Sequence, residues 1–319
     1  MALSDLDHAD APPARPVSTA APKPGKRKRL TRLRGRDLVV VSLMLGIPII
    51  VDLVLIWAPA FASIGLSFTS WNGIGDIKVV GWLNYDNIIN NYPQFWPAVQ
   101  NNLLWLAFLG VLATPVGLFF AVLLDKSIRL TRFYQGAIYM PVVLSLAIVG
   151  FIAQLVLSRD YGALNRMLGN TENPIDWLGD PDLNIWAILV AVAWKHVGYV
   201  MVLYLAGLKA VDPALKESAA LDGANEVQTF LKVTFPTLTP INIIVLVITV
   251  IEALRAFDIV YAINRGRNGL ELLSVLVTDN IVGEASRIGF GSAIAVILLM
   301  ISMIFVVIYL SRVMREERS

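Results

Sequence analysis

The sequence contains no cysteine and none of the familiar catalytic motifs. Without cysteine the chain has no disulfide, no thiolate nucleophile and no cysteine metal ligand. It also lacks the phosphate-binding loop of nucleotide hydrolases, the H-E-x-x-H zinc motif and the nucleophile elbow of serine hydrolases. We therefore expect no catalytic residue and no metal site here, and no ATP hydrolysis by this chain alone.

Apolar residues are abundant instead. They make up 56% of the 319 residues, and the mean hydropathy is +0.67. Six runs approach or exceed the roughly 20 residues that a helix needs to cross a bilayer. Nothing alternates with the period of a strand, so helices must satisfy the backbone in lipid. The sequence predicts an all-α, polytopic membrane protein with six transmembrane helices, at about 38–64, 102–124, 136–157, 184–207, 238–262 and 290–311.

The charge is unevenly distributed, although the net charge is only +2. Basic residues crowd the approach to the first run, which places this end in the cytoplasm under the positive-inside rule. With six spans the C-terminus is cytoplasmic as well. We predict a disordered basic cytoplasmic tail over 1–36, a transmembrane domain over 37–312 and a short cytoplasmic tail over 313–319. A basic tail can bind nucleic acid or anionic lipid. The topology signal is the simpler interpretation, so we expect membrane lipid and no nucleic acid as a partner.

A polar insert over 212–236 separates the fourth and fifth runs on the predicted cytoplasmic side. Asp212 and Pro213 suit the N-cap and first position of a helix, and Gly223 suits a left-handed ending. Asn225 and Gln228 have the spacing of a capping box. These signals predict a helix, a glycine turn and a second short helix that ends before Pro236, where the fifth span opens. An amphipathic helix resting on lipid headgroups is the plainer alternative.

The same insert resembles the E-A-A-x3-G-x9-I-x-L-P loop of ABC importer permeases. Glu217-Ser218-Ala219 is followed by three residues, Gly223, nine residues and Val233-Thr234-Phe235-Pro236, and Asp222-Gly223-Ala224 is similar to the D-G-A of sugar importers. Ser218, Val233 and Phe235 depart mildly from the pattern. The resemblance implies the type I importer permease fold and a coupling helix that sits in a cleft of a cytoplasmic ATPase. The residues that it assigns to ATPase coupling are Glu217, Ser218, Ala219, Asp222, Gly223, Ala224 and Pro236.

The resemblance extends along most of the chain. Residues 80–85 look like the G-L-x-N-Y segment of these permeases, and residues 253–261 are close to the R-x-F-D-x-x-Y of the maltose and glycerol-phosphate type. The turn at 264–269 departs from the family's Gly-Gly-Pro turn. The resemblance implies a multi-pass subunit of the plasma (inner) membrane that imports a sugar or oligosaccharide. Its implied partners are a second homologous permease, two ATPase subunits that hold ATP and Mg, and an extracellular solute-binding protein. No cofactor is implied for this chain itself.

Several charged residues fall inside the predicted spans, where charge is costly and usually faces a partner or a watery cavity. Glu252, Arg255 and Asp258 have i, i+3, i+6 spacing, roughly one helical face, so we expect Arg255 and Asp258 to pair. Lys195 is expected to pair with Glu252 or to reach a sugar hydroxyl, and His196 to be a polar packing residue. Trp194 and Tyr199 suit stacking on a sugar or core packing equally. The candidate substrate path is Trp194, Lys195, Tyr199, Glu252, Arg255 and Asp258.

Two functional alternatives stay open at this point. A strongly basic cavity favours glycerol phosphate or another polar solute carried by the same superfamily. An ion-coupled secondary transporter predicts transport that persists without an ATPase and stops with an uncoupler. A membrane enzyme has no catalytic constellation to support it.

The first outer loop, about 65–101, is rich in aromatic residues. Such residues usually lie at the level of the lipid headgroups, and some suit a docking surface for an extracellular partner. Four prolines also fall within or near the spans, where each removes a backbone donor and predicts a kink. They are Pro48, Pro59, Pro115 and Pro141.

Overall fold

The structure is a computed structural model that describes residues 35–126, 129–283 and 286–316. It divides into two compact units, Met1–Leu55 and Ile56–Ser319. In the first unit, helix α1 (Gly35–Asp52) leads into the π-helical segment η1 (Leu53–Trp57). The predicted tail over 1–36 lies outside the described residues except for its last two, which belong to α1. The described residues contain helices and turns but no strand beyond one isolated bridge, so the all-α expectation is confirmed.

Four continuous helical stretches among the described residues are long and apolar enough to cross a membrane. Each coincides with a predicted span: Leu38–Leu66, Phe95–Asp125, Asn184–Ala210 and Ile288–Val307. Their elements beyond α1 and η1 are α2 (Ala58–Leu66), α4 (Phe95–Ala107), η2 (Phe108–Ala113), α5 (Thr114–Asp125), α9 (Asn184–Ala210) and α16 (Ile288–Glu316). Because α16 runs on to Glu316, it includes the first residues of the tail predicted over 313–319.

The other two predicted spans are broken. The third consists of α6 (Thr131–Val143) and α7 (Leu146–Leu157), which bend by 101° around Leu144 and Ser145. The fifth consists of α13 (Thr239–Leu254) and α14 (Asp258–Asn264), separated by three non-helical residues. Three further helices lie in the predicted outer loops, α3 (Leu83–Asn91), α8 (Ala163–Met167) and α15 (Leu273–Ile281).

Each π-helical segment in the described part of the chain ends two residues before a proline. The segments are η1, η2 and η3 (Phe230–Thr234), and the prolines are Pro59, Pro115 and Pro236. A proline ring collides with the carbonyl four residues earlier and has no N–H to donate to it. Widening the preceding turn to π geometry relieves both problems without ending the helix. The kinks predicted at Pro59 and Pro115 therefore take the form of π-helical turns inside continuous helices.

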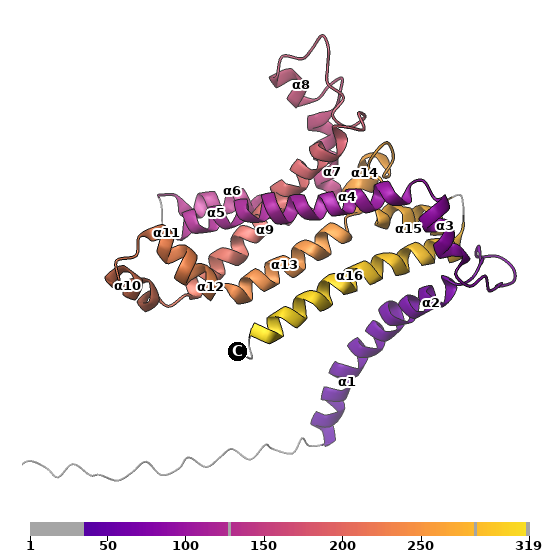
Figure 1. Ribbon diagram of the computed structural model, residues 1–319, viewed down its shortest axis with the longest axis horizontal. Coiled ribbons are helices and arrows are strands. Elements are labelled where there is room, and N and C mark those ends of the chain that lie inside the picture. Colours follow the sequence, from indigo (N-terminus) through magenta and orange to yellow (C-terminus); the bar gives the residue numbers. More distant parts are fainter. Residues whose placement is uncertain (1–34, 127–128, 284–285, 317–319) are drawn as a thin grey trace, which may run out of the picture. The chain divides into compact units, whose positions relative to one another are not determined.

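Helix α9 is the most buried of the continuous spans and passes beside α5, α6, α7 and α13 in the second unit (Figure 1). Glycines allow these close approaches. A Cβ on Gly198 would lie 2.3 Å from the carbonyl oxygen of Ile138 in α6, and one on Gly207 would lie 2.7 Å from the side chain of Ile241 in α13. The backbones of α9 and α6 are therefore in direct contact, which fixes where the side chains of α9 point.

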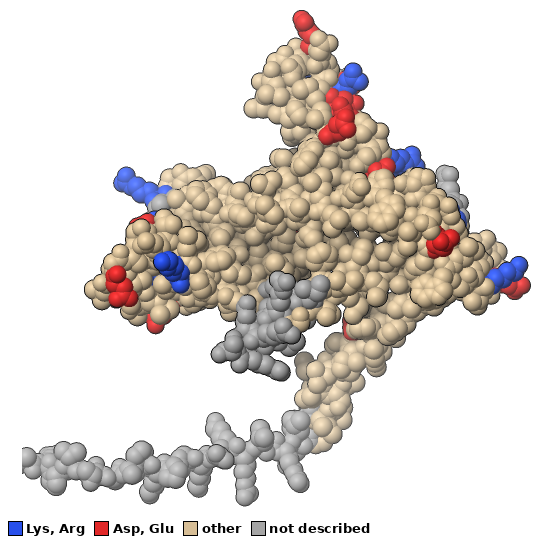
Figure 2. Space-filling view, in the orientation of Figure 1, with Lys and Arg blue, Asp and Glu red and all other residues tan. Residues whose placement is uncertain are grey.

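Three apolar clusters fill the second unit. One joins η2, α7, the first half of α9 and α14, and another joins α5, the second half of α9 and the start of α13. The third packs α3 and α4 against α15 and α16, and buries Phe95 of the aromatic outer loop. On the face shown in Figure 2, charged side chains gather at the two ends of the second unit and over α8, and the surface between them is nearly free of charge. This distribution suits a bundle surrounded by lipid.

Candidate functional site

The first part of the insert between α9 and α13 folds as the sequence predicted. Asp212 Oδ1 accepts a hydrogen bond from the Ala214 amide at 2.9 Å and so caps α10 (Pro213–Leu221). Helix α11 (Glu226–Thr229) opens with the predicted capping box. The Asn225 side chain accepts from the Gln228 amide at 2.9 Å, and the Gln228 side chain accepts from the Asn225 amide at 3.0 Å. Both helix starts are thus determined by local sequence.

Gly223 ends α10 in the predicted left-handed conformation, with φ of +80°. Its N–H donates to the Ala220 carbonyl at 3.1 Å, and the Ala224 N–H donates to the Ala219 carbonyl at 3.0 Å. This pair of bonds is the Schellman arrangement, which satisfies the last carbonyls of a helix. No atom lies within 4 Å of where a Cβ of Gly223 would be, so the glycine is required by backbone conformation and not by packing.

The end of the insert differs from the prediction. The second helix does not stop before Pro236, because η3 and α12 (Phe235–Thr237) carry the helical chain through it. The break comes at Leu238, and α13 begins at Thr239. Local sequence marks Pro236 as a helix start, but the π-helical turn before it accommodates the ring and leaves the helix continuous.

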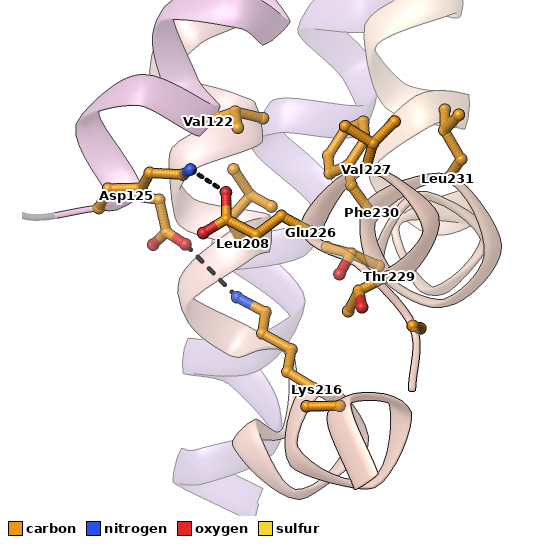
Figure 3. A pocket seen from close by; sticks show the side chains of 13 residues that line it. Val122, Asp125, Leu208, Lys216, Glu226, Val227, Thr229, Phe230 and Leu231 are labelled. Atoms are coloured by element: carbon orange, nitrogen blue, oxygen red, sulfur yellow. Dashed lines mark hydrogen bonds and ion pairs between the residues drawn. The ribbon is translucent and has the colours of Figure 1, made fainter. Parts of the chain in front are cut away.

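Ion pairs hold the insert, residues 212–236, against the end of α5. Lys126 Nζ lies 2.6 Å from Glu226 Oε2 of α11, and the two carboxylate oxygens of Asp125 lie 3.4 Å from Nζ of Lys216 and 3.9 Å from Nζ of Lys209. The hydrogen bond and charge of Lys126 hold the pKa of Glu226 below its ordinary value. All of these residues except Lys209 line a cavity of about 510 Å³ whose remaining lining is mainly apolar (Figure 3).

The residues that the resemblance assigns to coupling are mostly available to a partner. Glu217, Ser218, Asp222 and Gly223 are exposed on and after α10, and Pro236 is exposed further on. Ala219 is buried at 8% exposure, so it packs within the insert and offers no contact surface. Ala224 is half-buried and lines the cavity beside α5.

A second cavity, of about 290 Å³, brings together four of the six residues predicted for the substrate path. Lys195 comes from α9, Glu252 from the end of α13, Arg255 from the break and Asp258 from the start of α14. Trp105 and His196 also line it. Two cations and two carboxylates therefore face one hollow at the point where the fifth span is interrupted, and their charges balance.

The predicted pairing of Arg255 with Asp258 is wrong. The two residues are not on one helix, since α13 ends at Leu254 and α14 begins at Asp258, and no ion pair joins them in the described part of the chain. Side chains from other elements bond the carbonyls around the break. Asn102 donates to Ala253 at 3.1 Å, and Ser274 donates to Ala256. Tertiary hydrogen bonds thus stabilise the break between α13 and α14, which the apolar sequence does not predict.

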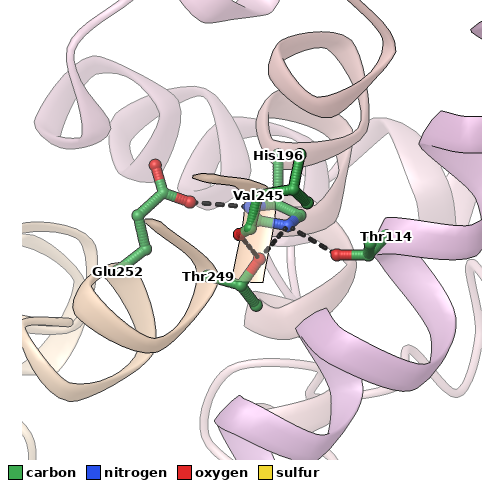
Figure 4. Close-up of polar contacts among 5 residues, drawn as sticks. All are labelled: Thr114, His196, Val245, Thr249 and Glu252. Atoms are coloured by element: carbon green, nitrogen blue, oxygen red, sulfur yellow. Dashed lines mark hydrogen bonds and ion pairs between the residues drawn. The ribbon is translucent and has the colours of Figure 1, made fainter. Parts of the chain in front are cut away.

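Glu252 also has a different partner from the one predicted. Lys195 donates to the carbonyl of Leu144 at the bend between α6 and α7. Glu252 Oε2 lies instead 2.6 Å from Nδ1 of His196, whose Nε2 lies 3.1 Å from the hydroxyl of Thr114 and 3.4 Å from that of Thr249 (Figure 4). His196 is 2% exposed, so the expectation of a polar packing residue is confirmed. Its place on the cavity wall was missed, because a lone histidine carries no spacing signal.

Trp194 and Tyr199 do not line this cavity. Trp194 is exposed on another side of α9, where it borders an apolar hollow of about 530 Å³ between η2, α5 and α6. Tyr199 is half-buried and lines none of the cavities described. Helical periodicity explains the position of Trp194, which lies about 100° around α9 from Lys195. Tyr199 lies on the same face as Lys195 but one turn further along α9, beyond the residues that line this cavity.

The fold and these two features define a class of protein: a helical membrane subunit with broken spans, a charged cavity at a break and a structured loop at one end. The sequence profile of the binding-protein-dependent transport system inner membrane component family matches residues 113–316. The chain belongs to this family, which confirms the resemblance drawn from the motifs.

Individual proteins agree with this assignment. The chain is 30% identical over 288 residues to the xylose/arabinose import permease protein XacH of Haloferax volcanii, with 88% of this chain and 89% of the relative covered. A bacterial ABC transporter involved in the import of the acidic polysaccharide alginate has a chain that aligns with a TM-score of 0.75 at 21% identity, covering 88% of this chain and 96% of that one. A structure of a bacterial alginate transporter in complex with a periplasmic protein bound to an alginate pentasaccharide aligns with a TM-score of 0.73 at 22% identity, covering 86% and 93%. These two structures support the fold.

Proposed function

We propose that this chain is one transmembrane subunit of an ATP-driven importer of a sugar or oligosaccharide, which a solute-binding protein delivers. It forms half of the path together with a second, homologous permease. Two cytoplasmic ATPase subunits hold the ATP and Mg, and both termini of this chain are cytoplasmic. The single observation that carries the proposal is the capped, ion-paired insert over 212–236 in a chain of this family.

The insert supports ATPase coupling by its construction. Helix α10 has capped ends, an exposed acidic and small-residue surface, and an ion pair from Lys216 to Asp125 at the end of α5. Helix α11 adds the pair between Glu226 and Lys126. An element held at both ends moves with the helices to which it is attached. Closing of an ATPase dimer against α10 would then reorient α5 and α9, which is the displacement that alternating access needs.

A neutral, hydroxyl-rich solute suits the membrane cavity. Lys195 and Arg255 are balanced by Glu252 and Asp258, so the hollow is not the strongly basic one that a phosphate ester favours. Charged side chains in a low-dielectric site form strong hydrogen bonds with hydroxyls. The xylose/arabinose permease that shares 30% identity with this chain supports the same substrate class.

Reconstitution in proteoliposomes tests the proposal. Sugar uptake by the complete complex must require ATP and the binding protein and must continue in the presence of an uncoupler. Uptake that persists without the ATPase and stops with an uncoupler would instead identify an ion-coupled transporter. The variant Gly223→Asp should lose uptake and co-purify less ATPase, and normal uptake by it would contradict the role of α10.

A further inference from the structure

A fourth cavity, of about 360 Å³, lies at the opposite end of the second unit from the insert. Its walls are α3, the segment around Trp71 and the start of α16 (Figure 1). Its volume is within the range of pockets that hold small molecules. It is separate from the membrane cavity, with which it shares no lining residue.

The lining combines amide side chains and aromatic rings with one cation. Asn87 and Asn91 contribute amides from α3, Trp71, Tyr92 and Phe290 contribute rings, and Arg287 contributes the charge. Among the described residues no carboxylate lines this hollow and none forms an ion pair with Arg287. Amides and a guanidinium bind hydroxyl groups, and flat rings bind the apolar face of a sugar.

Contacts within the protein hold the lining side chains of this hollow in place. The Arg287 guanidinium donates to Asn280 at 2.7 Å and lies 4.7 Å from the ring centre of Phe290. Asn280, which is 2% exposed, also donates to the hydroxyl of Tyr92 at 3.2 Å. Asn280 of α15 thus holds both the Arg287 guanidinium and the Tyr92 ring in position, which lowers the entropic cost of binding.

The wall of the hollow formed by the segment around Trp71 is held by contacts with the backbone of α16. The Gly289 amide donates to the Trp71 carbonyl at 2.9 Å, and a Cβ on Gly289 would lie 2.0 Å from the Thr69 carbonyl oxygen. Asn84 ties the same segment to α3 through bonds of 2.8 Å to the carbonyls of Ser67 and Thr69. The segment around Trp71 is therefore held close against α16.

The hollow adjoins a second polar cavity. Tyr92 and Arg287 also border this neighbouring cavity of about 480 Å³, which Tyr261 of α14 lines as well. Tyr261 lies three residues after Asp258, on the same face of α14, and Asp258 lines the membrane cavity. The neighbouring cavity therefore comes within one helical turn of the lining of the membrane cavity.

We propose that the hollow between α3 and α16 is an outer sugar subsite, occupied by one sugar unit before the sugar reaches the membrane cavity. This proposal rests on the proposed function, since it requires the transported solute to be a sugar. Asn87 and Asn91 bind hydroxyls, Arg287 binds a hydroxyl pair or a sugar carboxylate, and the rings of Trp71 and Tyr92 cover the apolar face.

Helix α3 supplies a matched pair of variants. Asn87 lines the hollow and accepts a side-chain hydrogen bond from Asn91, whereas Asn90 lies outside the hollow and donates one to Asp86. Asn87→Ala and Asn90→Ala each remove one amide from the same exposed helix and one i, i+4 bond. A difference in sugar binding between the two variants therefore results from the change in the hollow and not from a change in the stability of α3.

The experiment measures sugar binding by saturation-transfer NMR. The complete permease–ATPase complex is placed in lipid nanodiscs without the binding protein, and the probes are xylose, arabinose, maltose and galacturonate. We expect Asn87→Ala and Arg287→Gln to weaken binding of at least one probe roughly three- to tenfold, the effect of losing one hydrogen bond. Asn90→Ala should bind as the unaltered complex does, and the melting temperatures of the two α3 variants should agree.

The outcomes separate this proposal from the proposed function. Binding of every probe that is the same in Asn87→Ala, Arg287→Gln and the unaltered complex overturns the subsite, even when the complex imports sugar. The absence of any sugar uptake by the unaltered complex, measured independently in proteoliposomes with the binding protein, overturns the proposed function itself. Equal losses in Asn87→Ala and Asn90→Ala also overturn the subsite, because they place the effect in α3.

Discussion

Glu252 Oε2 lies 2.6 Å from Nδ1 of His196, which precedes it by 56 residues in the chain. The contact joins α13, two residues before its end, to the middle of α9. Through the other ring nitrogen the same imidazole reaches Thr114, which directly follows the π-helical turn η2 and precedes Pro115. One buried side chain therefore connects the interruption of the fifth span to the irregular turn of the second.

Replacing this histidine tests the connection. His196→Ala should lower the free energy of unfolding by about 1–3 kcal/mol, because it opens a void and leaves Glu252 without its partner. Glu252→Gln should cost less, since its amide oxygen still accepts a hydrogen bond from the ring. Thermal melting of the purified protein in detergent measures both. Equal melting of His196→Ala and the unaltered protein would show that the network carries no stability.

Glycines in α9 and α6 allow a matched test of helix contact. Gly198→Ala places a methyl group 2.3 Å from the Ile138 carbonyl, so α9 and α6 must separate. We expect a loss of about 1–3 kcal/mol, the usual cost of overpacking. Gly136→Ala in α6 has nothing within 4 Å and should be neutral or stabilising by up to about 1 kcal/mol, because alanine favours helix. Equal melting temperatures would contradict the close approach of the two helices.

Within this chain, the turn at Gly223 depends on backbone preference and not on packing. Its φ of +80° is unfavourable for most residues, and asparagine tolerates this region best. Gly223→Asn should retain most ATP-dependent uptake, whereas Gly223→Val should lose most of it. The open space around the position excludes a steric clash within this chain. Uptake that fails equally in both variants would assign the defect to a partner surface, and full uptake by Gly223→Val would show that the turn is dispensable.

The Lys126–Glu226 pair predicts pH and salt dependence in the attachment of α11. The pKa of Glu226 is lowered in the folded protein, so the pair stabilises the fold above the ordinary carboxyl pKa of about 4.3. The contribution is lost as pH falls through the lowered value. Both side chains are exposed, so salt should also weaken the pair.

Hydrogen exchange of the insert measures this effect. Protection of the α11 amides, corrected for intrinsic exchange, should fall below about pH 4 and at high salt, and both dependences should diminish in Glu226→Gln. Lys232→Gln is the control, since Lys232 lies in the same insert and forms no ion pair among the described residues. An unchanged pH profile in Glu226→Gln would exclude the pair as the cause.

The insert shows how far local sequence reaches. Asp212, Gly223 and Asn225 each determine a cap through bonds to residues two to five positions away, so their conformations follow from the sequence alone. The continuation through Pro236 was not predictable in this way. A proline before an apolar run indicates a helix start, and only the geometry of the preceding turn shows that the helix passes through it.

The charged cavity shows which features local sequence does not predict. Four of its residues could be predicted from the sequence, because a charged residue inside an apolar run is unusual whatever its neighbours in the fold are. The pairing of Arg255 with Asp258 was predicted wrongly because spacing along one helix was taken to determine it, and Glu252 bonds His196 instead of Lys195. Asn102 and Ser274 bond the backbone around the break in the fifth span, and they come from elements far away in the sequence.

The sequence by itself determined that this protein is a helical membrane protein and where its insert begins, because hydropathy, capping and turn chemistry act over a few residues, and its motifs resemble the family that the profile match shows. Only the tertiary structure decided that the third and fifth spans are broken, that Glu252 bonds His196 instead of Lys195, and that an amide-lined hollow forms between α3 and α16. These features depend on which helices lie side by side. That choice is made by the packing of whole faces, and no local pattern records it.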